Sequence, residues 1–270
     1  MLDWLQNPSF GDLLSSSSLN SYGYSPQTSS KPLSKAEPFA TTGQTRQAPG
    51  PIYDITPFST LDYPGHLSAI IWFAGCNMRC LYCYNGDIVF SKGKRSLDEA
   101  LDFLKKRIGL LDGVVLSGGE ATGFDGLIAF CRKIKALGFK IKLDTNGTHP
   151  QMIKALIEEN LLDYIALDYK APKTKFYAIT QNRNFSQFEK SLDLLLKENV
   201  SFEVRTTLHS DLLNVDDINE IAHDLEARGY RGTYYIQDFV QDVTTIGYIE
   251  NPQTAFDRNK VSSKLAIEYR

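Results

Sequence analysis

The sequence has few of the features that mark membrane, secreted or nucleic-acid-binding proteins. Its 270 residues include no apolar run of about 18 residues, so we expect no transmembrane helix. The N-terminus lacks the basic and apolar regions of a signal peptide. A net charge of −3 gives no indication of a nucleic-acid partner. The four cysteines do not suggest a disulfide framework, and we predict a reduced, cytoplasmic protein.

The chain divides by composition into three parts. Residues 1–50 are rich in Ser, Thr, Pro and Gln and have too few bulky apolar groups to offset the entropy of ordering, so they are predicted to be a disordered low-complexity tail. A mis-assigned translation start or a short docking helix are the alternatives. Residues 51–250 are the predicted core domain, and the hydrophobic content of the whole chain, 42%, is sufficient for a core. Residues 251–270 are expected to be a tail, or a short helix between Val261 and Ile267.

Beyond the tail, apolar runs of strand length alternate with amphipathic helical patterns. Ser96 begins a capping box, Asp216 or Asp217 is expected to cap the last helix, and Gly138 and Gly229 are placed to end two helices. Such alternation, with connections long enough for crossovers, predicts an α/β fold with a parallel sheet, either a barrel or a doubly wound sheet. Five helices separate six strands, which are expected at residues 67–73, 113–117, 140–144, 164–168, 202–207 and 234–237.

Three of the four cysteines, Cys76, Cys80 and Cys83, fall in one short loop after the first expected strand, with the spacing C-x3-C-x2-C. Structural zinc sites and ferredoxin-type clusters use four ligands. Three thiolates can hold three irons of a [4Fe–4S] cluster and leave the fourth iron open to a small molecule. The spacing therefore predicts chemistry rather than electron storage. Cys131 lies on the apolar stripe of an expected helix and is predicted to be buried in the core.

Polar residues follow the carboxyl ends of the other strands, the edge at which parallel α/β folds bind ligands. Glycines allow a ligand to approach the backbone, a carboxylate can accept from an ammonium, and an arginine offers a permanent charge to a carboxylate. Each of these residues also has a plain structural alternative when it is considered alone. Residues 118–120 could form a tight turn, Asp144 could belong to a turn or cap a helix, and Lys170 could be a solvated surface residue. The strand-end set is Ser117, Gly118, Gly119, Glu120, Asp144, Thr145, Asn146, Gly147, Asp168, Lys170, Arg205, Thr207, His209 and Gln237. Of these, His209 is expected to be structural.

The cysteine loop resembles that of the radical S-adenosylmethionine (SAM) superfamily, with Tyr82 in place of the aromatic residue before its third cysteine. The resemblance implies a partial (β/α)6 barrel and a [4Fe–4S] cluster whose three cysteine ligands are Cys76, Cys80 and Cys83. It also implies that SAM binds the open iron and contacts the strand ends. The implied SAM-binding residues are Tyr82, Gly118, Gly119, Glu120, Asp144, Thr145, Asn146, Asp168, Lys170 and Arg205, with Ala121 where the superfamily usually has Pro.

Three stretches narrow the resemblance to the enzymes that activate glycyl-radical enzymes. Residues 144–147 and 163–170 are similar to strand-end motifs of these activating enzymes. The Asp62-Tyr63-Pro64-Gly65 stretch resembles the lead-in of the proteins that activate anaerobic (class III) ribonucleoside-triphosphate reductases. Tyr84 departs from the family, which commonly has His at that position. The resemblance covers roughly residues 52–239.

The resemblance implies that the enzyme cleaves SAM reductively and forms a glycyl radical on a partner protein. Anaerobic ribonucleotide reductase is the expected partner, and flavodoxin or ferredoxin the expected reductant. Three alternatives remain open at this point. They are a pyruvate formate-lyase-type activating enzyme, a radical SAM enzyme acting on a small molecule, and a non-catalytic electron carrier or metal-stabilised binding module.

Overall fold

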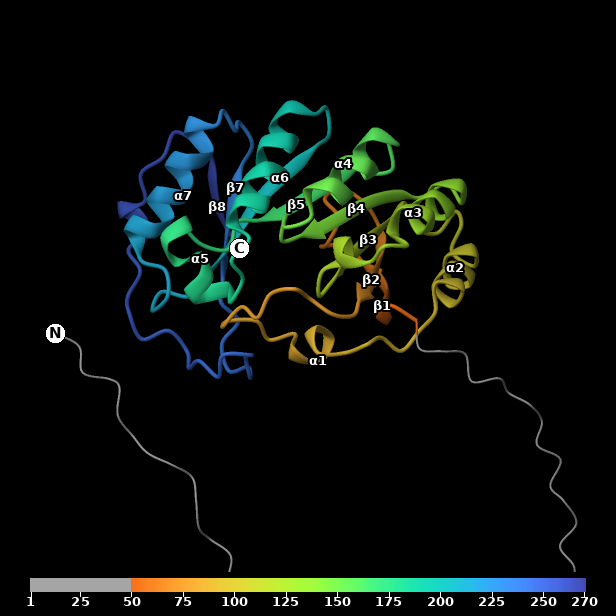
Figure 1. Ribbon diagram of the computed structural model, residues 1–270, viewed down its shortest axis with the longest axis horizontal. Helices are drawn as coiled ribbons and strands as arrows, with labels where there is room; N and C mark the ends of the chain where they lie inside the picture. The colour runs from red at the N-terminus through yellow and green to blue at the C-terminus, as the bar shows by residue number, and fades with distance from the viewer. Residues whose placement is uncertain (1–49) are drawn as a thin grey trace, which may run out of the picture. The chain divides into compact units, whose positions relative to one another are not determined.

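The computed structural model describes residues 50–270, so the predicted tail of residues 1–50 falls almost wholly outside the described residues. Eight strands in this part form one sheet, in which the spatial order follows the chain from β1 to β8 (Figure 1). β1 is antiparallel to β2, and every later neighbour is parallel. The strands are β1 (Ile52–Ser59), β2 (Ser68–Phe73), β3 (Gly113–Gly118), β4 (Lys140–Thr145), β5 (Tyr164–Asp168), β6 (Phe202–Leu208), β7 (Tyr234–Asp238) and β8 (Ile267–Tyr269).

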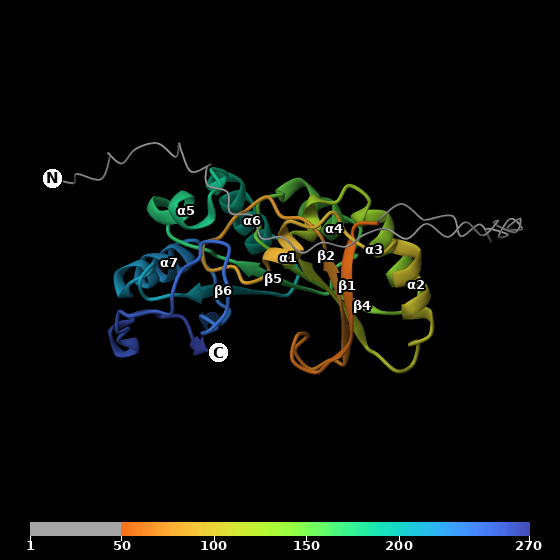
Figure 2. The same ribbon diagram turned by 90° about the horizontal axis from the view of Figure 1, so that it is seen from below.

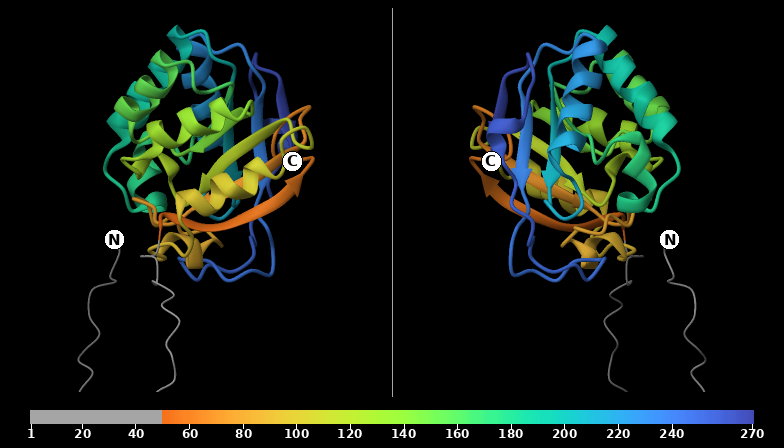
Figure 3. Two further views of the ribbon diagram at one scale, coloured as in Figure 1. Left: turned by 90° about the vertical axis from the view of Figure 1, so that its right-hand side faces the viewer. Right: turned by 90° about the vertical axis from the view of Figure 1, so that its left-hand side faces the viewer.

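The helices cover the outer face of this sheet, which is strongly curved (Figure 3). The six parallel strands β2 to β7 are the predicted partial (β/α)6 barrel, and this prediction is confirmed. In the described residues β1 and β8 are the two edges and do not pair with each other, so the barrel is open. The α-helices of this region are α1 (Gly86–Val89), α2 (Leu97–Lys105), α3 (Leu127–Ala136), α4 (Pro150–Glu158), α5 (Lys173–Thr180), α6 (Phe185–Lys197) and α7 (Val215–Ala227).

Local signals in the sequence set the ends of several helices. Ser96 and Glu99 form the expected reciprocal capping box before α2. Gly138 and Gly229, after α3 and α7, have φ values of +89° and +90°, which favour glycine. The predicted cap of α7 was wrong by two to three residues. Asn214 is the cap, and Asp217 completes the box from inside the helix.

The two faces of each strand have different environments. On β4, Ile141 and Leu143 pack in the core beneath the helices, whereas the side chains between and after them, Lys142 and Asp144, lie on the opposite face. That inner face encloses a second, smaller cluster at the amino ends of the strands, formed by Tyr63, Ile70 and Val115 with Trp72 and Tyr164. Tyr63 comes from the long connection between β1 and β2, which projects from the sheet in Figure 2. The polar ends of the strands are thereby left for a site.

The end of the chain differs from the prediction of a tail or short helix. A 3-10 turn at Arg258–Lys260 is followed by β8, which pairs with β7. The Tyr234 amide donates to the Ala266 carbonyl at 2.8 Å. The unpaired edge of β7 supplies these hydrogen bonds, and a three-residue strand has no periodicity that a sequence would reveal. β1, α1 and α5 were not predicted either. Among the described helices, none has the length and apolar character needed to cross a membrane.

Candidate active site

A cavity of about 310 Å³ lies at the carboxyl ends of the parallel strands. It brings together side chains from the cysteine loop and from β3, β4, β5, β6 and β7, as expected when parallel strands end at one edge. Every predicted site residue lines it. These are Cys76, Cys80, Tyr82, Cys83, Gly118, Gly119, Glu120, Asp144, Thr145, Asn146, Asp168, Lys170 and Arg205, and Ser117, Thr207 and Gln237 line it too.

The cysteine loop is attached to the carboxyl end of α5. The amides of Arg79 and Leu81 donate to the carbonyls of Thr180 and Ile179 at 2.8 and 2.9 Å. These carbonyls belong to the last turn of the helix, where carbonyls have no partner within the helix. The Asn182 side chain also donates to the Asn77 carbonyl at 2.9 Å. An unpredicted helix therefore fixes the path of the loop.

The three thiols are withdrawn from solvent to different degrees. Cys80 is buried, whereas Cys76 and Cys83 are half-buried. Burial raises the pKa of Cys76 to about 11 and that of Cys80 to about 12. In the described residues, no three His, Cys, Asp or Glu side chains are arranged to hold a single metal ion. The three thiols face one shared cavity instead, an arrangement that suits a group larger than one ion.

The glycine loop after β3 packs directly on the start of the cysteine loop. The Glu120 amide donates to the Gly75 carbonyl at 2.9 Å. Gly118 has a φ of +117°, and a Cβ on Gly119 would lie 1.8 Å from the Gly75 oxygen. Both positions therefore require glycine. The Gly-Gly-Glu sequence is thus needed for the contact between two loops, besides any contact with a ligand.

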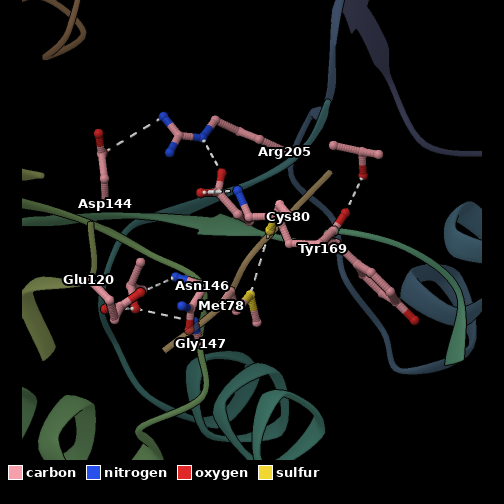
Figure 4. A network of polar contacts seen from close by, with 12 residues as sticks. Met78, Cys80, Glu120, Asp144, Asn146, Gly147, Tyr169 and Arg205 are labelled. Carbon is pink, nitrogen blue, oxygen red and sulfur yellow. Dashed lines mark hydrogen bonds and ion pairs between the residues drawn. The ribbon is translucent and has the colours of Figure 1, made fainter. Parts of the chain in front are cut away.

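Glu120 ties the ends of β3 and β4 together (Figure 4). Its carboxylate accepts four hydrogen bonds: from the Thr122 amide at 3.2 Å and hydroxyl at 2.5 Å, from the Thr145 hydroxyl at 2.8 Å, and from the Asn146 amide at 2.7 Å. Asn146 in turn reaches the cysteine loop, where its Nδ2 lies 2.9 Å from Asn77 Oδ1 and 3.9 Å from Cys76 Sγ. Glu120 therefore orders the wall of the cavity next to Cys76.

Replacing Glu120 with glutamine should lower the free energy of unfolding of the metal-free protein by roughly 1 to 3 kcal/mol. The new amide group would donate where the carboxylate accepts, so one or two of the four hydrogen bonds would be lost. Urea denaturation measures the effect. Glu159→Gln is the control, because Glu159 also accepts two hydrogen bonds, from Arg132, but on the surface. Equal losses in both variants would contradict the tethering role.

A row of alternating charges crosses the inner face of the sheet. Lys142 lies 2.6 Å from Asp144, which lies 3.7 Å from Arg205. Arg205 is 3.0 Å from Asp168, which is 3.0 Å from Lys170. Figure 4 shows Arg205 between the two carboxylates. The row holds three positive and two negative groups, and its members that line the cavity are two carboxylates and the two cations Lys170 and Arg205.

The neighbours of the row keep its members charged. Burial alone would raise the pKa of Asp168, but the positive charges and hydrogen bonds of Arg205 and Lys170 outweigh it and lower the pKa. Burial would likewise lower the pKa of Lys170, but the Asp168 carboxylate raises it well above its usual range. The ion pair is therefore maintained across the neutral pH range.

Lys142 was not predicted as a member of the charged row; the residue is 2% exposed and does not line the cavity. The sequence contained a signal for this pairing, because Lys142 and Asp144 are two residues apart on a strand and so share a face.

Tyr82 lines the cavity beside the cysteines, and its buried hydroxyl has no hydrogen-bond partner among the described residues. Cys131 is buried beneath the helices, as predicted.

The sequence profile of the Radical SAM superfamily matches residues 70–228. The chain therefore belongs to the radical SAM superfamily. The cofactors of this superfamily are a [4Fe–4S] cluster and S-adenosylmethionine, as predicted from the cysteine loop.

Relatives agree with this membership, and a solved structure has a similar fold. A protein of Methanocaldococcus jannaschii named "Putative glycyl-radical enzyme activating enzyme" is 38% identical over 178 residues, which cover 62% of this chain and 72% of that protein. The "Pyruvate formate-lyase 1-activating enzyme" of Escherichia coli is 33% identical over 132 residues, which cover 45% of this chain and 52% of that enzyme. Streptococcus suis SuiB bound to S-adenosylmethionine has a similar fold, with a TM-score of 0.57 at 12% identity over 74% of this chain and 51% of SuiB.

Proposed function

We propose that Cys76, Cys80 and Cys83 bind three irons of a [4Fe–4S] cluster, and that the strand-end residues hold SAM beside it. The observation that carries this proposal is that the three thiols and four members of the charged row, Asp144, Arg205, Asp168 and Lys170, line one cavity. The donor set fits the cluster, because the fourth cysteine is buried outside the cavity and one iron would remain open. It also fits SAM, whose methionine portion carries both an ammonium and a carboxylate.

Each part of the cavity has a distinct task in this proposal. Lys170 and Arg205 attract the carboxylate, and backbone carbonyls of the cavity-lining glycine loop, Gly118 and Gly119, accept from the ammonium. Asp144 and Asp168 hold the two cations in place, so they are not displaced when the ligand leaves. Asn146 directs an amide N–H at the Cys76 sulfur, which favours the thiolate. When bound, the cluster and SAM supply one-electron cleavage of a sulfonium bond and a carbon radical that can remove a hydrogen atom.

The substrate that we propose is a glycine residue of a partner enzyme, and the partner is anaerobic ribonucleoside-triphosphate reductase. The named activating enzymes among the relatives support the first part. The Asp62-Tyr63-Pro64-Gly65 stretch supports the second. Flavodoxin or ferredoxin would supply the electron. Pyruvate formate-lyase is the second candidate partner, because relatives named for its activation match this chain.

Anaerobic electron paramagnetic resonance tests the proposal. The reconstituted protein, with SAM, a reductant and the organism's anaerobic ribonucleotide reductase, is expected to give a glycyl-radical doublet. Cys80→Ala should abolish the doublet, whereas Cys131→Ala, which removes a thiol outside the cavity, should retain it. A doublet only with pyruvate formate-lyase would identify the second candidate. Formation of 5′-deoxyadenosine without any protein radical would point to a small-molecule substrate, and an unaffected Cys80→Ala variant would refute the cluster assignment.

A further inference from the structure

Residues 240–251, between β7 and the 3-10 turn, form a loop that we call the strap. Its two ends are joined by reciprocal hydrogen bonds: the Asp242 amide donates to Asn251 Oδ1 at 2.9 Å, and Asn251 Nδ2 donates to Asp242 Oδ1 at 2.8 Å. The imidazole of His209, at the end of β6, is 2.9 Å from the Glu250 carbonyl and donates to it through Nε2. The base of the strap is therefore fixed to the barrel.

The strap is also ordered internally. Thr245 is buried, and its hydroxyl accepts from the Ile249 amide at 3.1 Å. The Tyr248 amide donates to the Thr245 carbonyl at 3.1 Å, which makes a tight turn at the tip. Val243 and Ile249 pack against the main core. A loop with these contacts can hold another segment in place, because its own shape is determined.

The tip of the strap contacts the cysteine loop through the backbone. The amides of Ile246 and Gly247 donate to the carbonyls of Cys83 and Leu81 at 2.8 and 2.9 Å. A Cβ on Gly247 would lie 2.8 Å from the Leu81 backbone, so only glycine permits this approach. Leu81 is held on both sides, since its amide donates to Ile179 and its carbonyl accepts from Gly247. The third cysteine thus lies in a peptide segment clamped between α5 and the strap.

We infer that the strap is a positioning element for the third thiolate, with Gly247 and Ile246 as its positioning residues. The inference rests on the proposed cluster assignment. Cys80 is buried, whereas Cys83 is half-buried and its carbonyl accepts a hydrogen bond from the strap. By fixing the Cys83 carbonyl, the strap keeps the thiol directed into the cavity and slows its exchange with solvent ligands.

Iron release from the reconstituted protein tests this inference. Gly247→Val should push the strap away from Leu81, and Asn251→Ala should open its base without entering the cavity. We expect each variant to lose iron to a chelator about tenfold faster than the natural protein. Gly247→Val breaks the backbone hydrogen bonds between the strap and the cysteine loop, and Asn251→Ala removes the hydrogen bonds with Asp242 that support them. The reduced cluster should also give an altered electron paramagnetic resonance line shape. Tyr248→Asn is the matched control, because Tyr248 is 86% exposed and Asn tolerates its φ of +51°.

The outcomes separate the two proposals. If the natural protein takes up a cluster and both variants release iron at its rate, the strap has no positioning role. If Tyr248→Asn also releases iron quickly, faster release does not require loss of the backbone contacts, and the inference is contradicted. A natural protein that binds no iron would overturn the cluster assignment and the strap's role with it. Melting curves of the metal-free variants identify any that fail to fold, and Asn251→Ala, at the surface, is expected to fold normally.

Discussion

Replacing Gly119 with alanine is expected to separate the glycine loop from the cysteine loop and to prevent stable iron binding. The added methyl group would lie 1.8 Å from the Gly75 oxygen. The opposing atom belongs to the backbone, so it cannot rotate away as a side chain would. Two hydrogen bonds of 2.9 Å hold the glycine loop in place, from the Gly119 amide to the Phe73 carbonyl at the end of β2 and from the Glu120 amide to the Gly75 carbonyl before the cysteines. We expect the free energy of unfolding to fall by roughly 1 to 3 kcal/mol or more.

Urea denaturation and iron content after reconstitution measure this effect. Gly123→Ala, in the same loop region, is the control, because its nearest neighbour would be a His149 ring atom at 3.6 Å, an ordinary contact distance. The control should bind iron like the natural protein. Normal stability and iron content in Gly119→Ala would mean that the two loops can part without consequence for the site.

Replacing Asp168 with asparagine is expected to have the second large effect. Asp168 lies between Arg205 and Lys170, 3.0 Å from each, and all three side chains are mostly buried. Without the carboxylate, two positive groups would face each other on the inner side of the sheet. The free energy of unfolding of the metal-free protein should fall by roughly 2 to 4 kcal/mol, which is discounted because the cavity admits water.

The pH dependence of this loss identifies its origin. The pKa of Asp168 is lowered in the folded protein, so its contribution to stability is present above the unfolded pKa of about 4 and is lost as pH falls through the folded value. The difference between the natural protein and Asp168→Asn should therefore stay constant from pH 7 to about 5 and shrink below about 4. Lys154→Ala, which breaks an exposed pair with Glu158, should cause little change at any pH. If the stability difference between the two proteins stayed the same below pH 4, the loss would come from packing rather than from the Asp168 charge.

The sequence was sufficient to predict site residues whose positions follow from the alternation of strands and helices. Apart from Arg205, which lies within β6, each predicted site residue is at a strand end or in the cysteine loop, and parallel strands bring those points together whatever the details of packing. Lys142 lies within β4 before the polar strand end, and only the alternation of side chains reveals that it shares a face with Asp144.

The irregular segments could not be predicted, for a physical reason. The strap is held by backbone amides, which every residue except proline has, and so its sequence shows no distinctive pattern. β8 forms because β7 offers an open edge, a property of the assembled sheet rather than of residues 267–269. Gly247 carries some information, because a glycine in a loop can indicate that another backbone segment approaches closely. The sequence does not reveal that this segment is the cysteine loop.

The contact between the strap and the cysteine loop has a consequence for the order of events during synthesis. Cys83 leaves the ribosome early, together with β2, whereas Ile246 emerges only after all the strands of the parallel barrel. The neighbouring strands can pair one after another as they appear, because the sheet follows the order of the chain. The cysteine loop must wait for almost the whole polypeptide. Iron that reached the nascent chain would meet a cysteine loop not yet held by the strap. We therefore expect stable iron binding only after translation is complete.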